Sequence, residues 1–185
     1  MAWAPRTWVV GEIVTGAHMN EEIKNQFNNR AARQAVQGAD LTITNSITPV
    51  DTDMAFTAQP GEIYAYWAYI AYSATINSDF CWVWSVPSGT VMHRNIVGFD
   101  PANTAAGVGT GGSILMRRPS PGTQVVIGGK SATSPPGDHR SALDMGTITM
   151  GATGGTIRML VTQGTSHADQ TILRALSTVL YQRIA

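Results

Sequence analysis

The residues of this chain that could do chemistry come in pairs. Asp51 and Asp53 are separated by one residue, so on a strand both carboxylates would point to the same side. Glycosidases and calcium sites both use carboxylates that converge in this way. Because no third acidic residue stands near them in the sequence, a capping or turn role is the simpler interpretation.

Two histidine–aspartate pairs could belong to a catalytic triad or a metal site. His167 precedes Asp169 by two residues, and Asp138 comes directly before His139. Both pairs fall in turn-rich stretches, no serine elbow accompanies them, and no two histidines stand four residues apart. The sequence therefore predicts surface loop residues here, with no catalytic residue, no bound metal and no cofactor.

Neither the glycine–lysine–serine run nor the cysteine supports a chemical site. Gly128-Gly129-Lys130-Ser131 resembles the end of a phosphate-binding loop, but the first glycine of that motif would fall at Gln124. Pro135-Pro136 also excludes the helix whose N-terminus would receive the phosphate. Cys81 is the only cysteine, so we expect no intramolecular disulfide and a small buried side chain at this position.

The aromatic side chains offer another kind of chemistry, because flat rings can stack on sugars. The chain has five tryptophans and five tyrosines, and five of these ten rings fall between residues 63 and 72. Their concentration in one stretch favours packing in a core or between subunits. A platform for a host-surface glycan stays open as the alternative.

The composition favours a protein that other subunits cover. Charged residues make up 13% of the 185 residues, and 12 basic residues balance 12 acidic ones, so the chain lacks the positive charge that duplex nucleic acid attracts. The longest apolar stretch, residues 63–72, is about half a membrane span, and no signal peptide opens the chain. We expect a protein made in a cytoplasm, without nucleic acid or membrane insertion, whose surfaces are committed to a symmetric assembly.

Residues 39–185 have the pattern of short strands separated by turns. Eight to ten stretches are rich in β-branched and aromatic residues, with glycine, proline and asparagine clusters between them. The expected strands are Leu41–Thr44, Met54–Thr57, Ile63–Tyr72, Phe80–Val86, Thr90–Val97, Gly112–Arg117, Thr123–Ile127, Leu143–Met150, Thr156–Gln163 and Thr171–Ile184. This spacing predicts a mainly β domain, an antiparallel β-sandwich or jelly roll.

The stretch Ile63–Tyr72 is apolar on both of its expected faces. One face would hold Tyr64, Tyr66, Ala68, Ile70 and Tyr72, and the other Ile63, Ala65, Trp67, Tyr69 and Ala71. Such a strand is central, and it is either buried on both sides or packed on its own core on one side and on a neighbouring subunit on the other. Trp82 and Trp84 likewise share one face of the next expected strand.

Residues 1–38 carry the one convincing helix of the sequence, His18–Arg33. Thr15 is suited to cap it, and Met19, Ile23 and Phe27 recur at four-residue steps along one face. Three apolar side chains make a stripe too narrow to hold a helix alone, and a helix of this length is marginally stable in water. It must therefore pack on its own β-domain, on copies of itself or on another protein.

We expect residues 1–38 to be an attachment arm. Large apolar side chains also precede the helix, beside Pro5 and Gly11. They either cover the core of the chain's own β-domain or dock on a partner, and docking is the preferred interpretation. The residues assigned to attachment and assembly are Trp3, Trp8, Ile13, Met19, Ile23 and Phe27.

Both ends of the chain resemble one family. The run Pro5–Asn20, which reads PRTWVVGEIVTGAHMN, and the run Asn25–Asn28 are similar to the opening of tail proteins from phages of actinobacteria. There a TW-x-x-GE-x-V-T-A-x-x-MN start precedes a short helix that ends near R-D-Q-F/L-N. Here Gly16 stands where alanine is common, and Lys24 stands near the usual arginine. The end of the chain, Thr171–Ala185, is similar to that family's LRAGS-x-L-x-x-x-RVA ending.

This resemblance implies a non-enzymatic virion structural protein, assembled in the host cytoplasm and carried on the particle. A minor tail or tail-fibre component is the expected position, and a capsid decoration protein on the head surface is the alternative. The expected partners are further copies of the chain, as a trimer by analogy with jelly-roll appendages, and other tail or capsid proteins. A host-glycan-binding module is a second alternative, and a cell-wall hydrolase is the weakest because no catalytic set is present.

Overall fold

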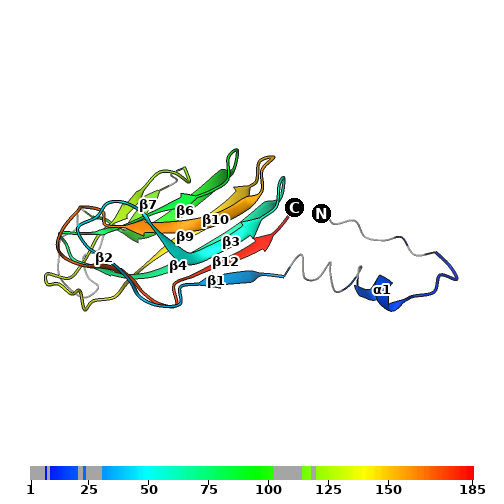
Figure 1. The fold of residues 1–185 in the computed structure, drawn as a ribbon, viewed down its shortest axis with the longest axis horizontal. Coiled ribbons are helices and arrows are strands. Elements are labelled where there is room, and N and C mark those ends of the chain that lie inside the picture. Colours follow the sequence, from blue (N-terminus) through cyan, green and yellow to red (C-terminus); the bar gives the residue numbers. More distant parts are fainter. Residues whose placement is uncertain (1–6, 8, 21–22, 24–30, 102–113, 118–119) are drawn as a thin grey trace.

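Two antiparallel sheets packed face to face form the body of the protein, and helix α1 lies beyond the end of the sandwich at which the chain terminates (Figure 1). The computed structural model describes residues 7, 9–20, 23, 31–101, 114–117 and 120–185, without the side chains of residues 114–117. The mainly β, jelly-roll-like sandwich expected from the turn-punctuated sequence is confirmed.

The larger sheet contains the longest strand, β4 (Ile63–Ala74), at its centre. Its strand order is β1 (Arg33–Val36), β12 (Thr178–Arg183), β4, β9 (Arg140–Thr149), β6 (Val91–Phe99) and β7 (Ile114–Arg117). A short extension pairs β11 (Thr171–Leu173) with both β4 and β2 (Leu41–Ile43). The smaller sheet has the order β3 (Val50–Ala58), β10 (Gly155–Thr162), β5 (Phe80–Ser85) and β8 (Val125–Ile127).

The core fills the space between the sheets, and the alternation of β4 explains how. Tyr64, Tyr66, Ala68, Ile70 and Tyr72 are all buried on its inner side. Opposite them, Trp82 and Trp84 of β5 are buried on the inner side of the smaller sheet, and the Trp84 ring meets the Tyr66 ring at a centroid distance of 5.4 Å. Both sets share the faces that the sequence predicted, and the free Cys81, which directly precedes Trp82 on β5, is buried as expected.

The other side of β4 is not buried within this chain. Trp67 and Tyr69 each expose 48% of their surface, although β4 lies between β12 and β9 in the sheet. The central position is therefore confirmed, and burial of both faces within a single chain is excluded. The outer side of β4 is exposed in the single chain, and a subunit neighbour that covers it stays a prediction.

Apart from shifts of a few residues at several strand ends, the structure differs from the sequence prediction in one unexpected strand and one broken strand. β1 begins at Arg33, where the expected helix was to end, and it pairs with β12 along the sheet edge. The expected last strand, Thr171–Ile184, is broken into β11 and β12 because Leu176 adopts a left-handed conformation with φ of 67°. Ser177 stabilises this break, since its hydroxyl accepts from the Ala71 N–H at 3.0 Å. Neither a short edge strand nor one left-handed residue leaves a clear periodic signal in a sequence.

The N-terminal helix is described only in its first turn, α1 (Gly16–Met19). Thr15 caps it as predicted, with its hydroxyl oxygen accepting from the His18 N–H at 3.2 Å. The helix thus begins two residues before the expected His18, and most of the expected remainder lies outside the described residues. Within the described residues, no helix is long and apolar enough to cross a membrane.

Candidate functional site

The N-terminal arm presents its apolar side chains to solvent. Val9 exposes 70% of its surface and Ile13 exposes 80%, Val10 is fully exposed, and α1 has no buried residue. Their local contacts are polar, such as the Val9 N–H, which donates to the Glu12 carboxylate at 3.2 Å. The described part of the arm therefore does not cover the core of its own β-domain.

Three of the six predicted attachment residues can be placed. Ile13, Met19 and Ile23 are all exposed. Trp3, Trp8 and Phe27 lie outside the described residues. The arm remains the predicted attachment segment, and its described apolar side chains are available to a partner.

A second exposed apolar surface covers the large sheet on the side that faces away from the core. We call it the outer face and define it by alternate residues: 34 and 36 of β1, 178–182 of β12, 63–71 of β4, 141–149 of β9 and 91–97 of β6. Leu180 and Leu143 expose 42% and 40% of their surfaces, beside the half-exposed Trp67 and Tyr69. These four side chains form the apolar centre of the outer face.

Strand register brings the apolar residues together in two neighbouring rows. Trp67 pairs with Leu180 of β12 on one side and with Met145 of β9 on the other. Tyr69 pairs with Leu143, which in turn pairs with Val97 of β6. Residues directly opposite on antiparallel strands have Cβ atoms about 5 Å apart, so these six side chains make one continuous patch.

The outer face carries no aspartate, glutamate, lysine or arginine at the positions that define it. Its remaining polar side chains are uncharged amides and hydroxyls, and His93 of β6 is its one imidazole. In an antiparallel sheet with one solvated face, each strand usually alternates apolar residues that face the core with polar or charged residues that face water. This face instead has the composition of the centre of a protein interface, where charged residues are depleted and aromatic residues enriched.

The outer side of the smaller sheet is charged. Asp51 and Asp53 are both exposed on the same side of β3, as their spacing predicted. Asp51 forms an ion pair with Arg158 of β10, and Asp53 accepts from the Gly38 N–H at 3.0 Å. The two carboxylates therefore have separate structural partners, and they lie within a strand and not in the expected turn.

One buried charge cluster was missed by sequence reasoning. Asp144 of β9 and Arg94 of β6 are fully buried between the sheets, where Nη2 of Arg94 lies 2.6 Å from the carboxylate. The indole N–H groups of Trp82 and Trp84 donate to Asp144 at 2.8 and 2.9 Å, and the Tyr66 hydroxyl donates at 2.8 Å. Burial raises the pKa of Tyr66, and the neighbouring Asp144 charge raises it further.

This cluster is structural because its groups satisfy one another and the side chains of Arg94 and Asp144 are fully buried. Hydrogen bonds from both tryptophans of the small sheet converge on one carboxylate of the large sheet, which fixes how the sheets face each other. A signal for it exists in the sequence. Strand alternation places Asp144 on the same side as the buried Ala142 and Ile148, and an acidic residue at an inner position requires a partner.

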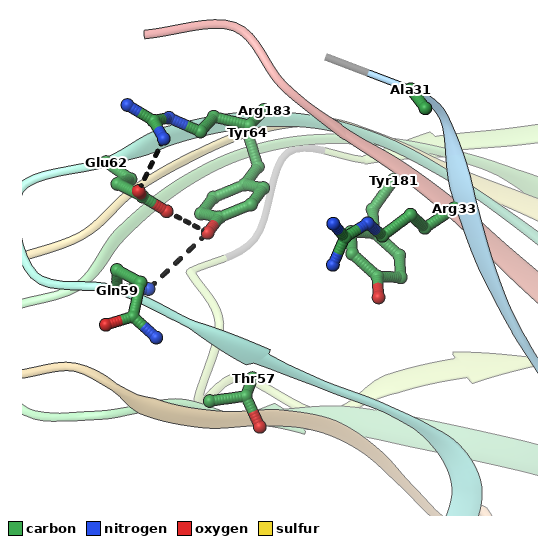
Figure 2. A pocket seen from close by; sticks show the side chains of 8 residues that line it. All are labelled: Ala31, Arg33, Thr57, Gln59, Glu62, Tyr64, Tyr181 and Arg183. Carbon is green, nitrogen blue, oxygen red and sulfur yellow. Dashed lines mark hydrogen bonds and ion pairs between the residues drawn. The ribbon is translucent and has the colours of Figure 1, made fainter. Parts of the chain in front are cut away.

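A small pocket opens at the end of the sandwich near the base of the arm (Figure 2). It has a volume of about 150 Å³ and is lined by Ala31, Arg33, Thr57, Gln59, Glu62, Tyr64, Tyr181 and Arg183. Glu62 forms an ion pair with Arg183 at 2.9 Å and accepts from the Tyr64 hydroxyl. Burial raises the pKa of Tyr64 to about 12, and its bond to Glu62 adds to that rise. The polar groups visible in the pocket thus cross-link β4 and β12.

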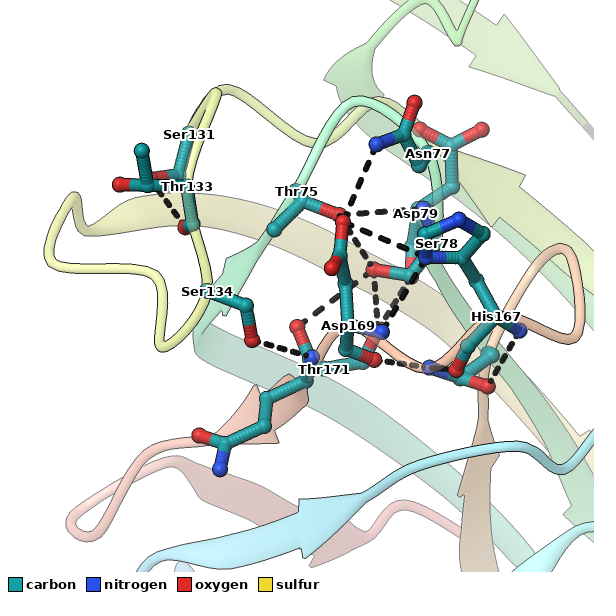
Figure 3. Close-up of polar contacts among 12 residues, drawn as sticks. Thr75, Asn77, Ser78, Asp79, Ser131, Thr133, Ser134, His167, Asp169 and Thr171 are labelled. Carbon is teal, nitrogen blue, oxygen red and sulfur yellow. Dashed lines mark hydrogen bonds and ion pairs between the residues drawn. The ribbon is translucent and has the colours of Figure 1, made fainter.

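The His167–Asp169 pair lies in a polar network at the opposite end of the sandwich (Figure 3). The Asp169 carboxylate accepts from the Thr75 hydroxyl at 2.9 Å and from Asn77 Nδ2 at 3.1 Å, and His167 Nδ1 lies 3.3 Å away. The Asn77 and Thr75 bonds hold the pKa of Asp169 below its usual value. The network ties the β4–β5 turn to the loop before β11, so the pair works as a loop cross-link.

The glycine–lysine–serine run and Asp138 also have structural partners. Lys130 of the glycine–lysine–serine run forms an ion pair with Asp138 at 3.4 Å, and Gly128 N–H donates to the Phe99 carbonyl at 2.9 Å. His139 is exposed next to Asp138. Within the described part of the chain, no three His, Cys, Asp or Glu side chains converge as metal ligands would.

No protein-family model and no curated protein matches the chain. Among solved structures, it is similar to Eiger TNF from S. frugiperda, with 12% identity, a TM-score of 0.39 and coverage of 84% of this chain and 94% of that one. It is also similar to the tripod (BppUct-A-L) from the baseplate of bacteriophage Tuc2009, with 8% identity, a TM-score of 0.32 and coverage of 100% and 76%. The VP2 subviral particle of infectious bursal disease virus matches with 9% identity, a TM-score of 0.20 and coverage of 85% and 42%.

Proposed function

We propose that this chain is a non-enzymatic bacteriophage virion structural protein: a homo-oligomeric, trimeric β-domain that the N-terminal arm attaches to the particle. We place it in the tail, as a minor tail or fibre component, because both ends of the sequence resemble such proteins. The observation that carries the proposal is the arm. Its described apolar residues, from Val9 to Ile23, are exposed and lie away from the sandwich (Figure 1).

Exposure of this kind is a driving force for docking. Burial of apolar surface stabilises a complex by about 25 cal/mol for each Å² removed from water. Ile13, Met19 and Ile23 expose 80%, 45% and 56% of their surfaces, and a short helix gains stability when its apolar face is covered. Docking on another virion protein would therefore bury exposed apolar surface of the arm and stabilise its short helix.

A host-glycan-binding module is the second candidate, and the exposed Trp67 and Tyr69 favour it. Flat rings can stack on sugars, but sugar hydroxyls also need hydrogen-bonding side chains beside the rings. The nearest paired neighbours of Trp67 are the apolar Leu180 and Met145. The structural role is therefore the stronger proposal.

The test is incorporation into particles. Ile13→Glu, Met19→Glu and Ile23→Glu should each give a folded protein that assembles into particles much less than the wild type, because a carboxylate cannot be buried against an apolar partner. Ile47→Glu is the matched control, since Ile47 is an exposed isoleucine in a loop of the sandwich, 55% accessible. Wild-type incorporation of all three arm variants would overturn the proposal.

Position on the particle is read by immunogold labelling with an antibody to residues 39–185. Label at one end of the tail supports a tail or fibre component. Label over the head contradicts the tail assignment and identifies a capsid decoration protein, which would use the same arm to hold capsid subunits.

A further inference from the structure

We propose that the outer face of the large sheet is the surface through which the chain associates with further copies of itself. The assignment rests on the proposed function for the expectation that the protein is a homo-oligomer. It adds which surface makes the contact, and that surface is separate from the arm.

The apolar centre of the outer face is a contiguous patch and not a set of scattered residues. Single exposed apolar residues are normal, but contiguous apolar patches on soluble proteins mark interaction sites. Trp67, Tyr69, Leu143 and Leu180 are between 40% and 48% exposed, and strand pairing makes them neighbours. Tryptophan and tyrosine are also the side chains that most often dominate interface energies.

The absence of charge on this face points to a second copy rather than to a different partner. Near a symmetry axis, a residue faces its own counterpart, so any charge there would meet the same charge. The five strands of the outer face present no carboxylate, ammonium or guanidinium group at the defining positions. A partner with a different sequence would impose no such restriction, and interfaces between different proteins commonly use complementary charges.

The size and the rim of the face also fit self-association. Five strands about 4.8 Å apart, each rising about 3.3 Å per residue over about seven residues, cover an area on the order of 600 Å² in projection. Stable interfaces bury about 800 Å² of accessible surface on each partner, which a corrugated face of this projected area approaches. The rim supplies uncharged hydrogen-bonding groups, including Gln34, Asn95, Thr178 and Gln182.

The face carries both a protrusion and a hollow. Trp67 and Tyr69 stand on β4 with half of each ring in solvent. One strand pair away, a hollow of about 340 Å³ is lined by Met92, His93, Arg94, Asn95, Met145 and Gly146.

The experiment measures the mass of the full-length protein in solution by light scattering after size exclusion. The wild type should have a multiple of the 19.7 kDa chain mass, and three chains would give the expected trimer. Leu143→Glu and Tyr69→Glu should raise the dissociation constant by about 100-fold or more, because each places a like charge against its copies in a desolvated contact. Thr57→Glu is the matched control, as Thr57 is exposed on the outer side of the smaller sheet, and it should keep the wild-type mass.

Two neutral variants guard against loss of folding. Tyr69→Gln and Leu180→Gln remove apolar surface without adding charge, and circular dichroism checks that they stay folded. At a protein concentration of about 100 µM, oligomers with dissociation constants up to about that value are detectable. A wild type that is a monomer at this concentration overturns the proposal. So does an unchanged mass in folded Leu143→Glu and Tyr69→Glu.

The arm variants separate this proposal from the preceding one. Ile13→Glu should lose incorporation into particles and keep the oligomer mass. If Ile13→Glu dissociates the oligomer and Leu143→Glu does not, the arm is the self-association surface and the outer-face assignment fails while attachment by the arm stands. If Tyr69→Gln loses binding to purified host wall and keeps its mass, the face binds glycan and the assignment fails.

Discussion

The two outer sides of this sandwich follow the same alternation of strand residues, and they differ in what the outward positions hold. On the smaller sheet, Asp51, Asp53 and Arg158 face solvent, and two of the three pair with each other. On the large sheet, the corresponding positions around Trp67 and Tyr69 are apolar or neutral. The first side is stable in contact with water, whereas covering the apolar second side with another surface lowers the free energy of the system.

The difference teaches that alternation decides which side of a strand faces the core, and residue type decides what covers the other side. In β3 a polar outward set gives an ordinary solvated strand. In β4 the outward set is as apolar as the inward set. Both outer sides exist only while the two sheets stay packed on a common core. Substitutions in that core are therefore expected to have the largest effect on stability.

The largest effect is expected from Asp144→Asn. The substitution removes the charge that pairs with the buried Arg94 and accepts from both indoles, and loss of one partner of a buried ion pair destabilises a protein by about 3–5 kcal/mol. Urea unfolding followed by tryptophan fluorescence measures the change. Asp53→Asn on the charged outer side is the control, with an expected change below about 1 kcal/mol. Equal changes in the two variants would contradict a central role for the cluster.

The next effect sharpens the contrast between the two outer sides. Because association stabilises the folded state by mass action, the melting temperature of the wild type should rise by roughly 5 °C over a hundredfold increase in protein concentration. Leu143→Glu should show almost no dependence on concentration, and Thr57→Glu should behave as the wild type. Differential scanning calorimetry at several concentrations makes the comparison. If the melting temperature of the wild type does not depend on protein concentration, both outer sides are exposed to water and the contrast fails.

A smaller effect is expected in acid, from carboxylates that belong to neither outer side. The Ala175 N–H, at 2.8 Å, and Arg174 hold the pKa of Asp40 below its usual value, and the Asn77 and Thr75 bonds do the same for Asp169. Since these pKa values are lower in the folded state than the unfolded value near 3.9, their stabilisation is present above about pH 4 and is lost as the pH falls through the folded values. Melting temperatures between about pH 6 and pH 2 measure the loss.

The control for the acid prediction is a pair of amide variants. Asp40→Asn and Asp169→Asn should each be less stable than the wild type at neutral pH and should lose less stability on acidification. If their acid profiles match that of the wild type, other carboxylates cause the loss.

The smallest effect is expected from Arg158→Ala. Its ion pair with Asp51 is exposed to solvent, where such pairs contribute about 0–1 kcal/mol. The free energy of unfolding should therefore change by less than about 1 kcal/mol, and this change should be smaller at high salt because salt screens exposed charges. A change as large as that of Asp144→Asn would show that the charged side, like the interior, holds the fold together.

Much of the fold followed from the local pattern. Nearly all of the expected strand stretches correspond to strands in the structure, because β-branched and aromatic runs bounded by glycine and proline are a strong local signal. Strand β1 gave no such signal, since its Arg-Gln-Ala-Val run is short and half polar. The break at Leu176 was also hidden, because an isolated left-handed residue that is not glycine follows from its tertiary surroundings rather than from its type.

The candidate sites divide in the same way. The spacing of Asp51 and Asp53 correctly placed both carboxylates on one side of β3, and the hydroxyl side chain of Thr15 correctly identified the cap. Ile13, Met19 and Ile23 stay a predicted attachment surface, because what they dock on is another molecule. Asp144 was overlooked although its inner position could be read from the alternation of β9.

By itself, the sequence determined the position and period of most strands, the two apolar sides of β4 and the cap of α1, because each depends on neighbours within a few residues. The tertiary structure decided which side of β4 is buried. It also brought Asp144 together with Trp82, Trp84 and Arg94, and it lined up Leu180, Trp67 and Leu143 in a single uncharged patch. These residues lie on strands far apart in the chain, and only the register of one strand against the next determines which of them meet.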